Sequence, residues 1–475
     1  MAMADKTIIH WFQQDLRLTD NPALYQATKL GQVLPLYILD DLNPGRDTMG
    51  AASRVWLHHS LSSLQDSLDQ SLGLFKGDPI AILSSLIDRH NITDICWNIR
   101  YEPWCRKRDE KIIEWLESKG INVHLFNGSL LWNPESIHKE DGSPYKIFTP
   151  FYRRGCLNAD VPRTPLPSGK STGKWIKCTT TQTIDELDLI PTTRWDKKML
   201  SDWAIGESAA KRLLVSFLKK EIHQYKVGRD LPAQSCTSTL SPHIHFGEIS
   251  VCQIWHAIQE LSQDTNIDCF LSQLGWREFS YNLLLHNPNL SFKNLQSKFD
   301  AFPWSKNTAH LKAWQKGRTG IPMVDAGMRE LWQTGTMHNR LRMIIGSFLV
   351  KNLQIDWRKG ERWFWDCLFD ADLANNSAGW QWVAGSGTDA APYFRVFNPV
   401  TQGKKFDPDG NYVKRFVPEL KKMPLKYLFN PWEAPLSVLD KAGVKLGTTY
   451  PKPIVDLKES RLAALEAFSR LKRTK

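Results

Sequence analysis

The sequence lacks several patterns that define common classes of protein. Its eight cysteines are scattered without a C-x-x-C pair, which argues against a zinc site and a disulfide framework and predicts reduced thiols. No apolar run reaches membrane-spanning length, and residues 1–12 show no charged-then-apolar signal pattern. No repeat period is present either. We therefore expect a soluble, cytoplasmic, globular protein.

The N-terminal part alternates short apolar runs with amphipathic stretches. Helical spacing occupies residues 53–70, 79–90 and 103–119. Runs rich in Ile, Val, Leu and aromatic residues predict buried strands at 7–12, 33–40, 72–78, 92–98 and 121–127. This alternation predicts an α/β, Rossmann-like doubly wound parallel sheet. No G-x-G-x-x-G follows the first strand, so ordinary dinucleotide binding is not expected there.

The pattern changes twice along the chain. Residues 133–203 lose periodicity and contain a stretch rich in Pro, Gly, Ser and Thr, which indicates a long interdomain linker. Residues 204–475 are helical throughout, beginning with an amphipathic stretch that follows Gly206. We expect an α/β domain over 1–132, a linker over 133–203 and an all-α domain over 204–475.

Two bulk properties are unusual. Lys and Arg exceed Asp and Glu by 61 to 50, and the net charge of +11 favours a polyanion such as nucleic acid, although solubility alone could explain it. Tryptophan is abundant at 20 residues. Five of them lie between Trp357 and Trp382, a density that suggests a role beyond packing.

The segment Asp370 to Trp382, DADLANNSAGWQW, organises the helical part. If Asp370 and Asp372 are buried, each needs a cationic or donating partner, because an uncompensated buried charge costs several kcal/mol. Arg342 is the first candidate for that partner. Carboxylates, amides and indoles together suit a ring rich in N–H and C=O groups, whereas a capped helix start packed by Trp is the simpler interpretation.

Two other stretches carry candidate chemistry. Thr237 to Ser241 places hydroxyls before a helix, which suits either a pyrophosphate or plain capping. Trp276 and Arg277 lie in an otherwise apolar helix, with Gln273 one turn earlier. A buried Arg requires an anion, so we expect Arg277 to face phosphate or a cofactor.

Several motifs in order resemble the DNA photolyase/cryptochrome family, and most closely its class I cyclobutane-dimer photolyases. They are Trp11–Leu24 (WFQQDLRLTDNPAL), Thr237–Ser250, Trp276–Phe279, Gly320–Met343 and Gly379–Leu420. The resemblance implies an antenna domain and a helical FAD-binding domain. It implies a lyase that repairs cyclobutane pyrimidine dimers in DNA by electron transfer from excited reduced FAD. The alternative within the family is a blue-light photoreceptor.

The resemblance also assigns cofactor contacts residue by residue. Asn376 matches the residue that faces flavin N5, and Trp380, Trp357 and Trp304 match the chain that conducts electrons from the surface. Most tryptophans of any protein serve packing, and spacing alone shows no electron path. The expected FAD-binding residues are Tyr225, Thr237, Ser238, Thr239, Leu240, Ser241, Phe270, Arg277, Arg342, Asp370, Ala371, Asp372 and Asn376.

The family's DNA contacts map onto a second set of residues. Gln273 stands where dimer-repairing members usually have Glu, which leaves lesion preference open. Asn339 and Met343 stand where enzymes repairing the six-four photoproduct place histidines, so dimer splitting is favoured. The expected DNA-binding residues are Arg229, Gln273, Trp276, Arg277, Asn339, Met343, Trp382 and Arg395.

A second, light-harvesting chromophore is a further implication of the resemblance. Methenyltetrahydrofolate is favoured over a deazaflavin, yet Trp104, Cys105 and Ser291 replace the folate contacts of one subgroup. Trp104 could stack on a pterin or simply pack. We expect a monomer, and the lack of a long tail after the helical part weighs against a photoreceptor. A dark nucleic-acid-binding oxidoreductase is a further rival, but it would need a nicotinamide motif that is absent.

Overall fold

The N-terminal domain is built on one parallel sheet. The computed structural model describes residues 6–171, 173–389 and 394–473. The sheet has the order β3-β2-β1-β4-β5, and all its neighbouring strands are parallel. Its strands are β1 (Thr7–Phe12), β2 (Gln32–Leu39), β3 (Gly73–Lys76), β4 (Ile92–Asn98) and β5 (Asn122–Phe126). The predicted α/β fold with five strands is confirmed.

Helices cover both faces of this sheet. They are α1 (Pro22–Leu30), α2 (Ala51–Ser67), α3 (Pro79–His90) and α4 (Pro103–Ser118). Successive residues of a strand point to opposite faces. Ile8 accordingly joins Leu24 of α1 and Trp56 of α2 in one apolar cluster, whereas Ile9 joins Leu86 of α3 in another. Both faces are therefore buried, which explains why the strands read as continuous apolar runs.

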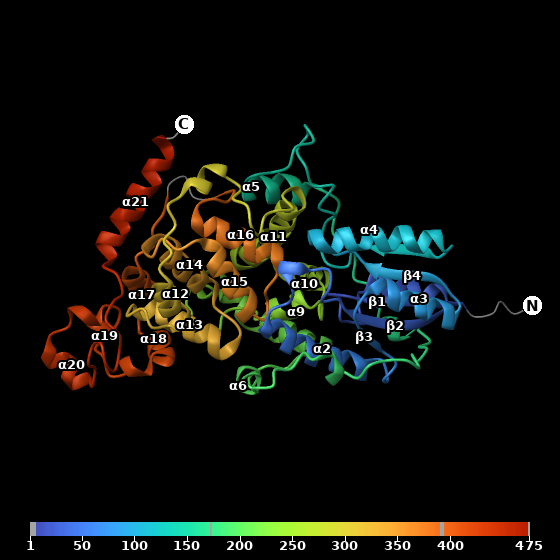
Figure 1. The fold of residues 1–475 in the computed structure, drawn as a ribbon, viewed down its shortest axis with the longest axis horizontal. Coiled ribbons are helices and arrows are strands. Elements are labelled where there is room, and N and C mark those ends of the chain that lie inside the picture. The colour runs from blue at the N-terminus through green and yellow to red at the C-terminus, as the bar shows by residue number, and fades with distance from the viewer. Residues whose placement is uncertain (1–5, 172, 390–393, 474–475) are drawn as a thin grey trace, which may run out of the picture.

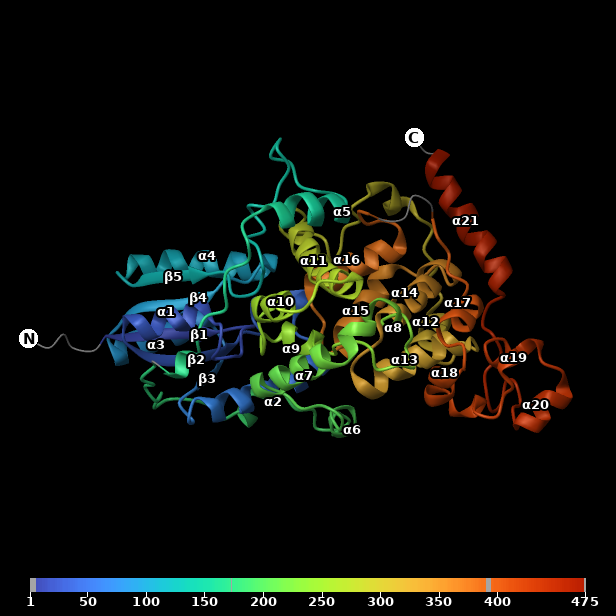
Figure 2. The same ribbon diagram turned by 180° about the vertical axis from the view of Figure 1, so that it is seen from behind.

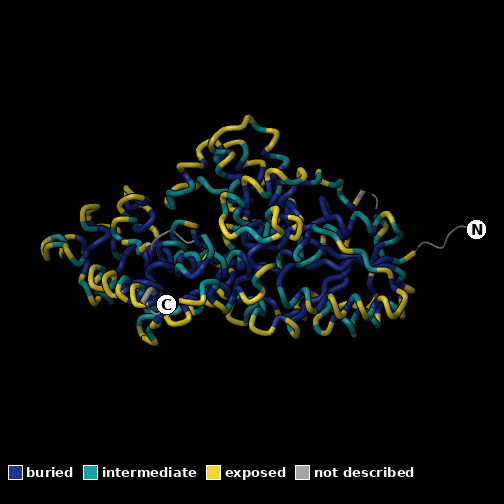
Figure 3. Tube along the Cα trace, turned by 90° about the horizontal axis from the view of Figure 1, so that it is seen from above, coloured by how far each residue is buried: buried dark blue, intermediate teal, exposed yellow. Residues whose placement is uncertain are grey.

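The C-terminal domain is all-helical around the largest apolar cluster. Figures 1 and 2 show it extending from the sheet domain, with α11 and α16 near the centre and α19, α20 and α21 at the far end. In Figure 3 the buried trace runs through the interiors of both domains. From the linker onward the helices are α5 (Phe148–Pro150), α6 (Asp196–Met199), α7 (Glu207–Lys219), α8 (Tyr225–Gly228), α9 (Ser241–His245), α10 (Val251–Gln259), α11 (Thr265–His286), α12 (Thr308–Gln315), α13 (Pro322–Thr334), α14 (Asn339–Ser347), α15 (Trp357–Cys367), α16 (Leu373–Ala384), α17 (Pro399–Phe406), α18 (Asn411–Phe416), α19 (Leu425–Leu428), α20 (Leu436–Ala442) and α21 (Leu457–Arg473).

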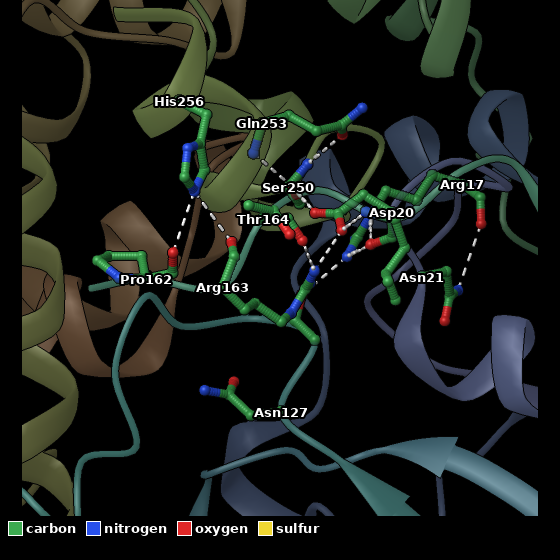
Figure 4. Close-up of polar contacts among 12 residues, drawn as sticks. Arg17, Asp20, Asn21, Asn127, Pro162, Arg163, Thr164, Ser250, Gln253 and His256 are labelled. Atoms are coloured by element: carbon green, nitrogen blue, oxygen red, sulfur yellow. Dashed lines mark hydrogen bonds and ion pairs between the residues drawn. The ribbon is translucent and has the colours of Figure 1, made fainter. Parts of the chain in front are cut away.

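A buried polar cluster fastens the two domains together (Figure 4). Asp20, from the loop after β1, is fully buried and pairs with Arg163 of the linker. The Ser250 hydroxyl, which caps α10, donates to the other oxygen of Asp20. His256 on α10 contacts the linker carbonyls of Pro162 and Arg163 at 3.1 and 3.0 Å. The loop after β1, the linker and α10 are thereby fixed to one another.

Candidate active site

The segment before α16 carries two carboxylates with little exposure, Asp370 and Asp372, which together are called the acidic wall. Arg342 of α14 binds both oxygens of Asp370 at 2.9 and 2.8 Å, as the sequence predicts. Burial would raise the pKa of Asp370, but Arg342 and the Ser241 hydroxyl lower it below its ordinary value. The carboxylate is therefore held ionised. Because Ser241 reaches Asp370, the hydroxyl-rich turn and the acidic segment share one wall.

Asp372 caps α16 and belongs to a second network. Its Oδ1 accepts from Asn375 N and Nδ2 at 2.8 and 2.7 Å, and its Oδ2 accepts from the Tyr281 hydroxyl at 2.5 Å. Burial, with the Asp372 charge next, raises the pKa of Tyr281 far above its usual range, so the phenol stays a donor. Oδ1 thus accepts two hydrogen bonds, whereas Oδ2 accepts one and keeps a second lone pair for an external N–H group.

Arg277 is compensated inside the protein. It lies over the Tyr281 ring at 4.8 Å and donates to the carbonyl of Ser129 at 2.8 Å and to Glu278 at 3.2 Å. Ser129 belongs to the stretch that follows β5, so Arg277 ties α11 to the N-terminal domain. The sequence predicts the anion requirement of this buried Arg but not these partners.

The hydroxyl-rich turn, which adjoins the acidic wall through Ser241, is partly open to solvent. Thr239 adopts φ +50°, the left-handed region, and both Thr239 and Ser241 are exposed. Thr237 and Ser238 are half-buried, and Leu240 is fully buried as the anchor of the turn. Phe270 of α11 and Tyr225 of α8 pack nearby with ring centroids 5.0 Å apart. Exposed hydroxyls facing buried acceptors fit FAD, whose pyrophosphate needs donors and whose rings carry N–H groups.

Asn376 contacts a buried glutamate, Glu361, that is not among the residues predicted from the sequence. Its Nδ2 donates to the Glu361 carbonyl at 3.1 Å and lies 3.3 Å from Glu361 Oε1. Glu361, on α15, is 2% exposed, and its Oε2 has no partner among the described residues. Burial raises the pKa of Glu361 to about 7. A carboxyl group that gains or loses a proton near neutrality therefore adjoins the predicted flavin contact.

Two of the three predicted electron-conducting tryptophans are buried and the third is partly exposed. Trp380 is 4% exposed, Trp357 is fully buried with its Nε1 donating to Asn294 at 2.9 Å, and Trp304 is half-buried. Trp380 and Trp357 therefore both lie in the core, and Trp304 is the member of the three that reaches the surface. Trp314 of α12, fully buried, lies 6.2 Å from Trp380 between ring centroids and was not selected from the sequence.

Three of the predicted DNA contacts belong to α11 and its surroundings. Gln273 donates to the Cys269 carbonyl at 3.1 Å and to Ser272 at 3.0 Å. Arg229 lies over Tyr225 at 5.4 Å. Trp276 is half-buried and stacks on Phe148.

The remaining predicted DNA contacts lie on other elements. Asn339 begins α14 and is exposed, and Met343 follows one turn later, half-buried. Trp382 of α16 is half-buried, and Arg395 is exposed beyond it.

A separate cleft opens at the C-terminal ends of β1 and β2. Its volume is about 690 Å³ with the solvent at its mouth included, and it reaches Ala371 between the two acidic residues. Trp11 Nε1 and Gln13 Nε2 line it as buried donors without a partner among the described residues. Arg108 lies over Trp11 and Trp104 at 4.8 and 5.2 Å. Unpaired donors and stacked aromatic rings suit a planar heteroaromatic ligand.

Fold and site together define a two-domain flavoprotein, and comparisons with known proteins identify its family. Residues 8–170 match the family described as DNA photolyase, and residues 270–470 match the FAD binding domain of DNA photolyase. The chain is 46% identical over 485 residues to the deoxyribodipyrimidine photo-lyase of Agrobacterium fabrum, with all of both chains covered. It is 37% identical to cryptochrome-1 of Arabidopsis thaliana, with 98% of this chain and 70% of that protein covered.

Solved structures agree with these sequence comparisons. A bacterial class III photolyase from Agrobacterium tumefaciens superposes with a TM-score of 0.95 at 45% identity, with coverage of 100% of this chain and 99% of that one. An archaeal photolyase from Sulfolobus tokodaii with two FAD molecules gives 0.81 at 30% identity, with coverage of 98% and 100%. The chain therefore belongs to the DNA photolyase/cryptochrome family.

Two expectations from the sequence are refined by these findings. The expected likeness to class I photolyases is not confirmed, because the photolyase that superposes at 0.95 is a class III protein. Over the described ranges, none of the helices combines the length and apolar character needed to cross a membrane.

Proposed function

We propose that this protein is a deoxyribodipyrimidine photolyase, which uses light to split cyclobutane pyrimidine dimers in DNA. The observation that carries the proposal is the wall formed by Asp370, Asp372 and the hydroxyl-rich turn, in which Ser241 hydrogen-bonds Asp370. A full-length relative at 46% identity is named a deoxyribodipyrimidine photo-lyase, which supports the same activity.

The protein's own residues hold and orient the flavin in this proposal. Thr237 to Ser241 donate to the pyrophosphate, while Asp370 and Asp372 accept from ring N–H groups, with Arg342 keeping Asp370 ionised. Asn376 would present its amide to flavin N5, and Trp380 would serve as the first residue of the path that reduces the flavin. When bound, reduced and excited by light, FAD would supply the electron that opens the cyclobutane ring, and it would take that electron back afterwards.

The DNA face combines charge with stacking surfaces. Arg229 and Arg395 bind backbone phosphates, consistent with the net charge of +11. Trp276 and Trp382 enclose the flipped-out dimer, which is already poorly stacked and so costs less to extrude than an intact base. Gln273 offers both an acceptor and a donor to the pyrimidine edges. We propose in addition a monomer, a cytoplasmic location and domain limits at 1–132, 133–203 and 204–475.

Repair under illumination tests the proposal against the photoreceptor alternative. Purified protein mixed with an oligonucleotide carrying one thymine dimer should restore the intact thymines under near-UV light and not in the dark. The cryptochrome named above falls within the same family. Retention of the dimer by a protein that binds and photoreduces flavin would therefore replace the repair proposal with a sensory one. A colourless protein that does not take up FAD would refute both.

The cleft beside β1 and β2 is proposed as the site of a light-harvesting chromophore. Ligands of doubly wound sheets bind at the carboxyl ends of the strands, which is where this cleft lies. The archaeal relative with two FAD molecules supports a second chromophore in the family. Methenyltetrahydrofolate is our first choice, and a second flavin or a deazaflavin fits the same donors.

Replacing Trp104 with alanine should remove the second chromophore without removing FAD. Trp104 lines the cleft and lies 5.2 Å from the Arg108 guanidinium, so its loss opens one stacking wall. Stacking contributes about 1–3 kcal/mol, which corresponds to a loss of affinity between about fivefold and about 150-fold. The absorption spectrum of the purified protein, compared before and after the substitution, measures this. An unchanged second band would place the chromophore elsewhere.

Replacing Asn376 with aspartate should change the redox state in which the flavin accumulates. A negative charge beside flavin N5 disfavours the electron-rich, reduced ring, whereas the neutral amide tolerates it. Absorption spectra recorded during illumination with an added electron donor report the fraction of reduced flavin. An identical reduction yield in the variant would contradict the placement of Asn376 at N5.

A further inference from the structure

One loop residue connects the two indoles proposed to enclose the dimer. The Asp389 carbonyl accepts a hydrogen bond from Trp382 Nε1 at 3.1 Å. Its carboxylate Oδ2 accepts one from the backbone N–H of Phe148 at 3.3 Å. Phe148 in turn stacks on Trp276, with ring centroids 3.9 Å apart and ring planes 10° apart. A continuous path of contacts therefore runs from Trp382 through Asp389 to Trp276.

The Phe148 end of this path is anchored in the core. On its other side Phe148 stacks with Tyr152, at 5.6 Å between centroids and 7° between planes. Tyr152 is 2% exposed and fits against Gly275, where a Cβ atom would lie 2.5 Å from the Tyr152 ring. Figures 1 and 2 both show α5 beside α11. Phe148 therefore backs Trp276 as part of a rigid stack.

At the other end of this path of contacts, the loop that precedes Asp389 is held by several hydrogen bonds. Asp389 adopts φ +53°, a region that few residues other than Gly, Asn and Asp occupy. The Gly387 N–H donates to the Gln381 carbonyl at 2.9 Å, and Gln296 Nε2 donates to the Gly387 carbonyl at 2.8 Å. A strained residue that persists under such constraints is a candidate for a functional role.

We propose that Asp389 is a positioning residue that sets the separation of Trp276 and Trp382. This inference rests on the proposed function, because it assumes that the dimer enters between these two indoles. Stacking contacts weaken steeply when a gap widens by even 0.5–1 Å. A carboxylate that fixes the linker and a carbonyl that fixes Trp382 hold that gap at one width. Asp389 touches neither the substrate nor the flavin in this proposal.

Three variants separate positioning from simple stability. D389G removes the carboxylate at a position where glycine suits the backbone. D389N keeps an acceptor for the Phe148 N–H and also tolerates the left-handed conformation. F148L removes the aromatic ring that backs Trp276 and leaves its backbone N–H in place. FAD absorbance and the thermal unfolding midpoint report whether each variant is folded.

Binding is measured on an oligonucleotide with one thymine dimer and on the same sequence undamaged. D389G and F148L should each raise the dissociation constant for the dimer about tenfold, the effect of one lost contact. Their affinity for undamaged DNA should stay within about twofold, because phosphate contacts dominate that binding. D389N should stay within about threefold of the unmodified protein, since its acceptor remains. The double variant D389G/F148L should lose much less than the product of the single losses, because both act through one contact.

The outcomes distinguish this inference from the proposed function. Failure of the unmodified protein to prefer the dimer over undamaged DNA overturns both. A preference that survives intact in D389G and F148L overturns the positioning role alone, as does an equal loss on both DNAs. If D389G does not fold, D389N and F148L decide: wild-type affinity for the dimer in F148L overturns the inference.

Discussion

Replacing Arg342 with methionine should destabilise the protein by about 3 kcal/mol and abolish tight FAD binding, because it leaves a buried carboxylate without its counter-charge. Asp370 has only 8% of its side chain exposed and takes two hydrogen bonds from the Arg342 guanidinium. Urea unfolding and the flavin content of the purified protein measure the two effects. The stability difference should shrink as the pH falls below the usual carboxyl pKa, because a protonated Asp370 needs no cation.

The chain offers a matched control for this substitution. Arg340 lies two residues earlier on α14 and pairs with Asp230 at 2.6 Å, but Asp230 is 37% exposed. Replacing Arg340 with methionine should cost less than about 1 kcal/mol, the usual value of an exposed pair, and leave flavin content unchanged. The double variant Arg342→Met with Asp370→Leu should regain stability but not FAD. Equal losses in the Arg340 and Arg342 variants would contradict the special role of the buried pair.

The parts of this structure governed by local pattern could be predicted from the sequence. Short continuous apolar runs placed the strands, and helical apolar spacing placed helices of the sheet domain, since each element buries surface that its own residues define. The Arg342–Asp370 pair was predictable for a similar reason. A buried carboxylate requires a cation, and the upstream run that contains Arg342 supplies one.

Contacts between distant segments could not be predicted in this way. The sequence indicated that Arg277 needs an anion or acceptor, but the carbonyl of Ser129, 148 positions earlier, gives no local signal. Phe148 resembles any apolar linker residue until the fold stacks it on Trp276. Asp389 follows a Gly-Ser-Gly-Thr loop and reads as a turn residue, although it joins two walls of the site.

Glu361 is the clearest residue of this kind, because α15 carries Arg358, Lys359 and Arg362 around it and reads as a solvated helix there. The fold nevertheless buries Glu361 against Asn376. Burial is the main cause that raises the pKa of Glu361 to about 7, opposed by Arg362 and Arg46 and reinforced by Asp47. The folded protein therefore binds a proton at Glu361 between pH 4.5 and about 7 that the unfolded chain has lost.

Replacing Glu361 with glutamine should remove a pH-dependent penalty from folding. A carboxyl group whose pKa is raised in the folded state destabilises the protein progressively as the pH rises from 4.5 towards 7. The variant should match the original protein near pH 4.5 and exceed its free energy of unfolding by about 3 kcal/mol at pH 8. Urea unfolding across this range measures the difference, and the exposed Glu117→Gln serves as control.

The same substitution bears on the flavin site. Glutamine keeps an acceptor for Asn376 but cannot release a proton, so any step in flavin photoreduction that depends on the charge beside Asn376 should lose its pH dependence near 7. Photoreduction rates measured between pH 6 and pH 8 in both proteins test this. The outcome that contradicts this role is a constant difference in the free energy of unfolding between the two proteins across the pH range, together with photoreduction rates that depend on pH in the same way. Glu361 would then keep one protonation state throughout, and its contact with Asn376 would serve packing alone.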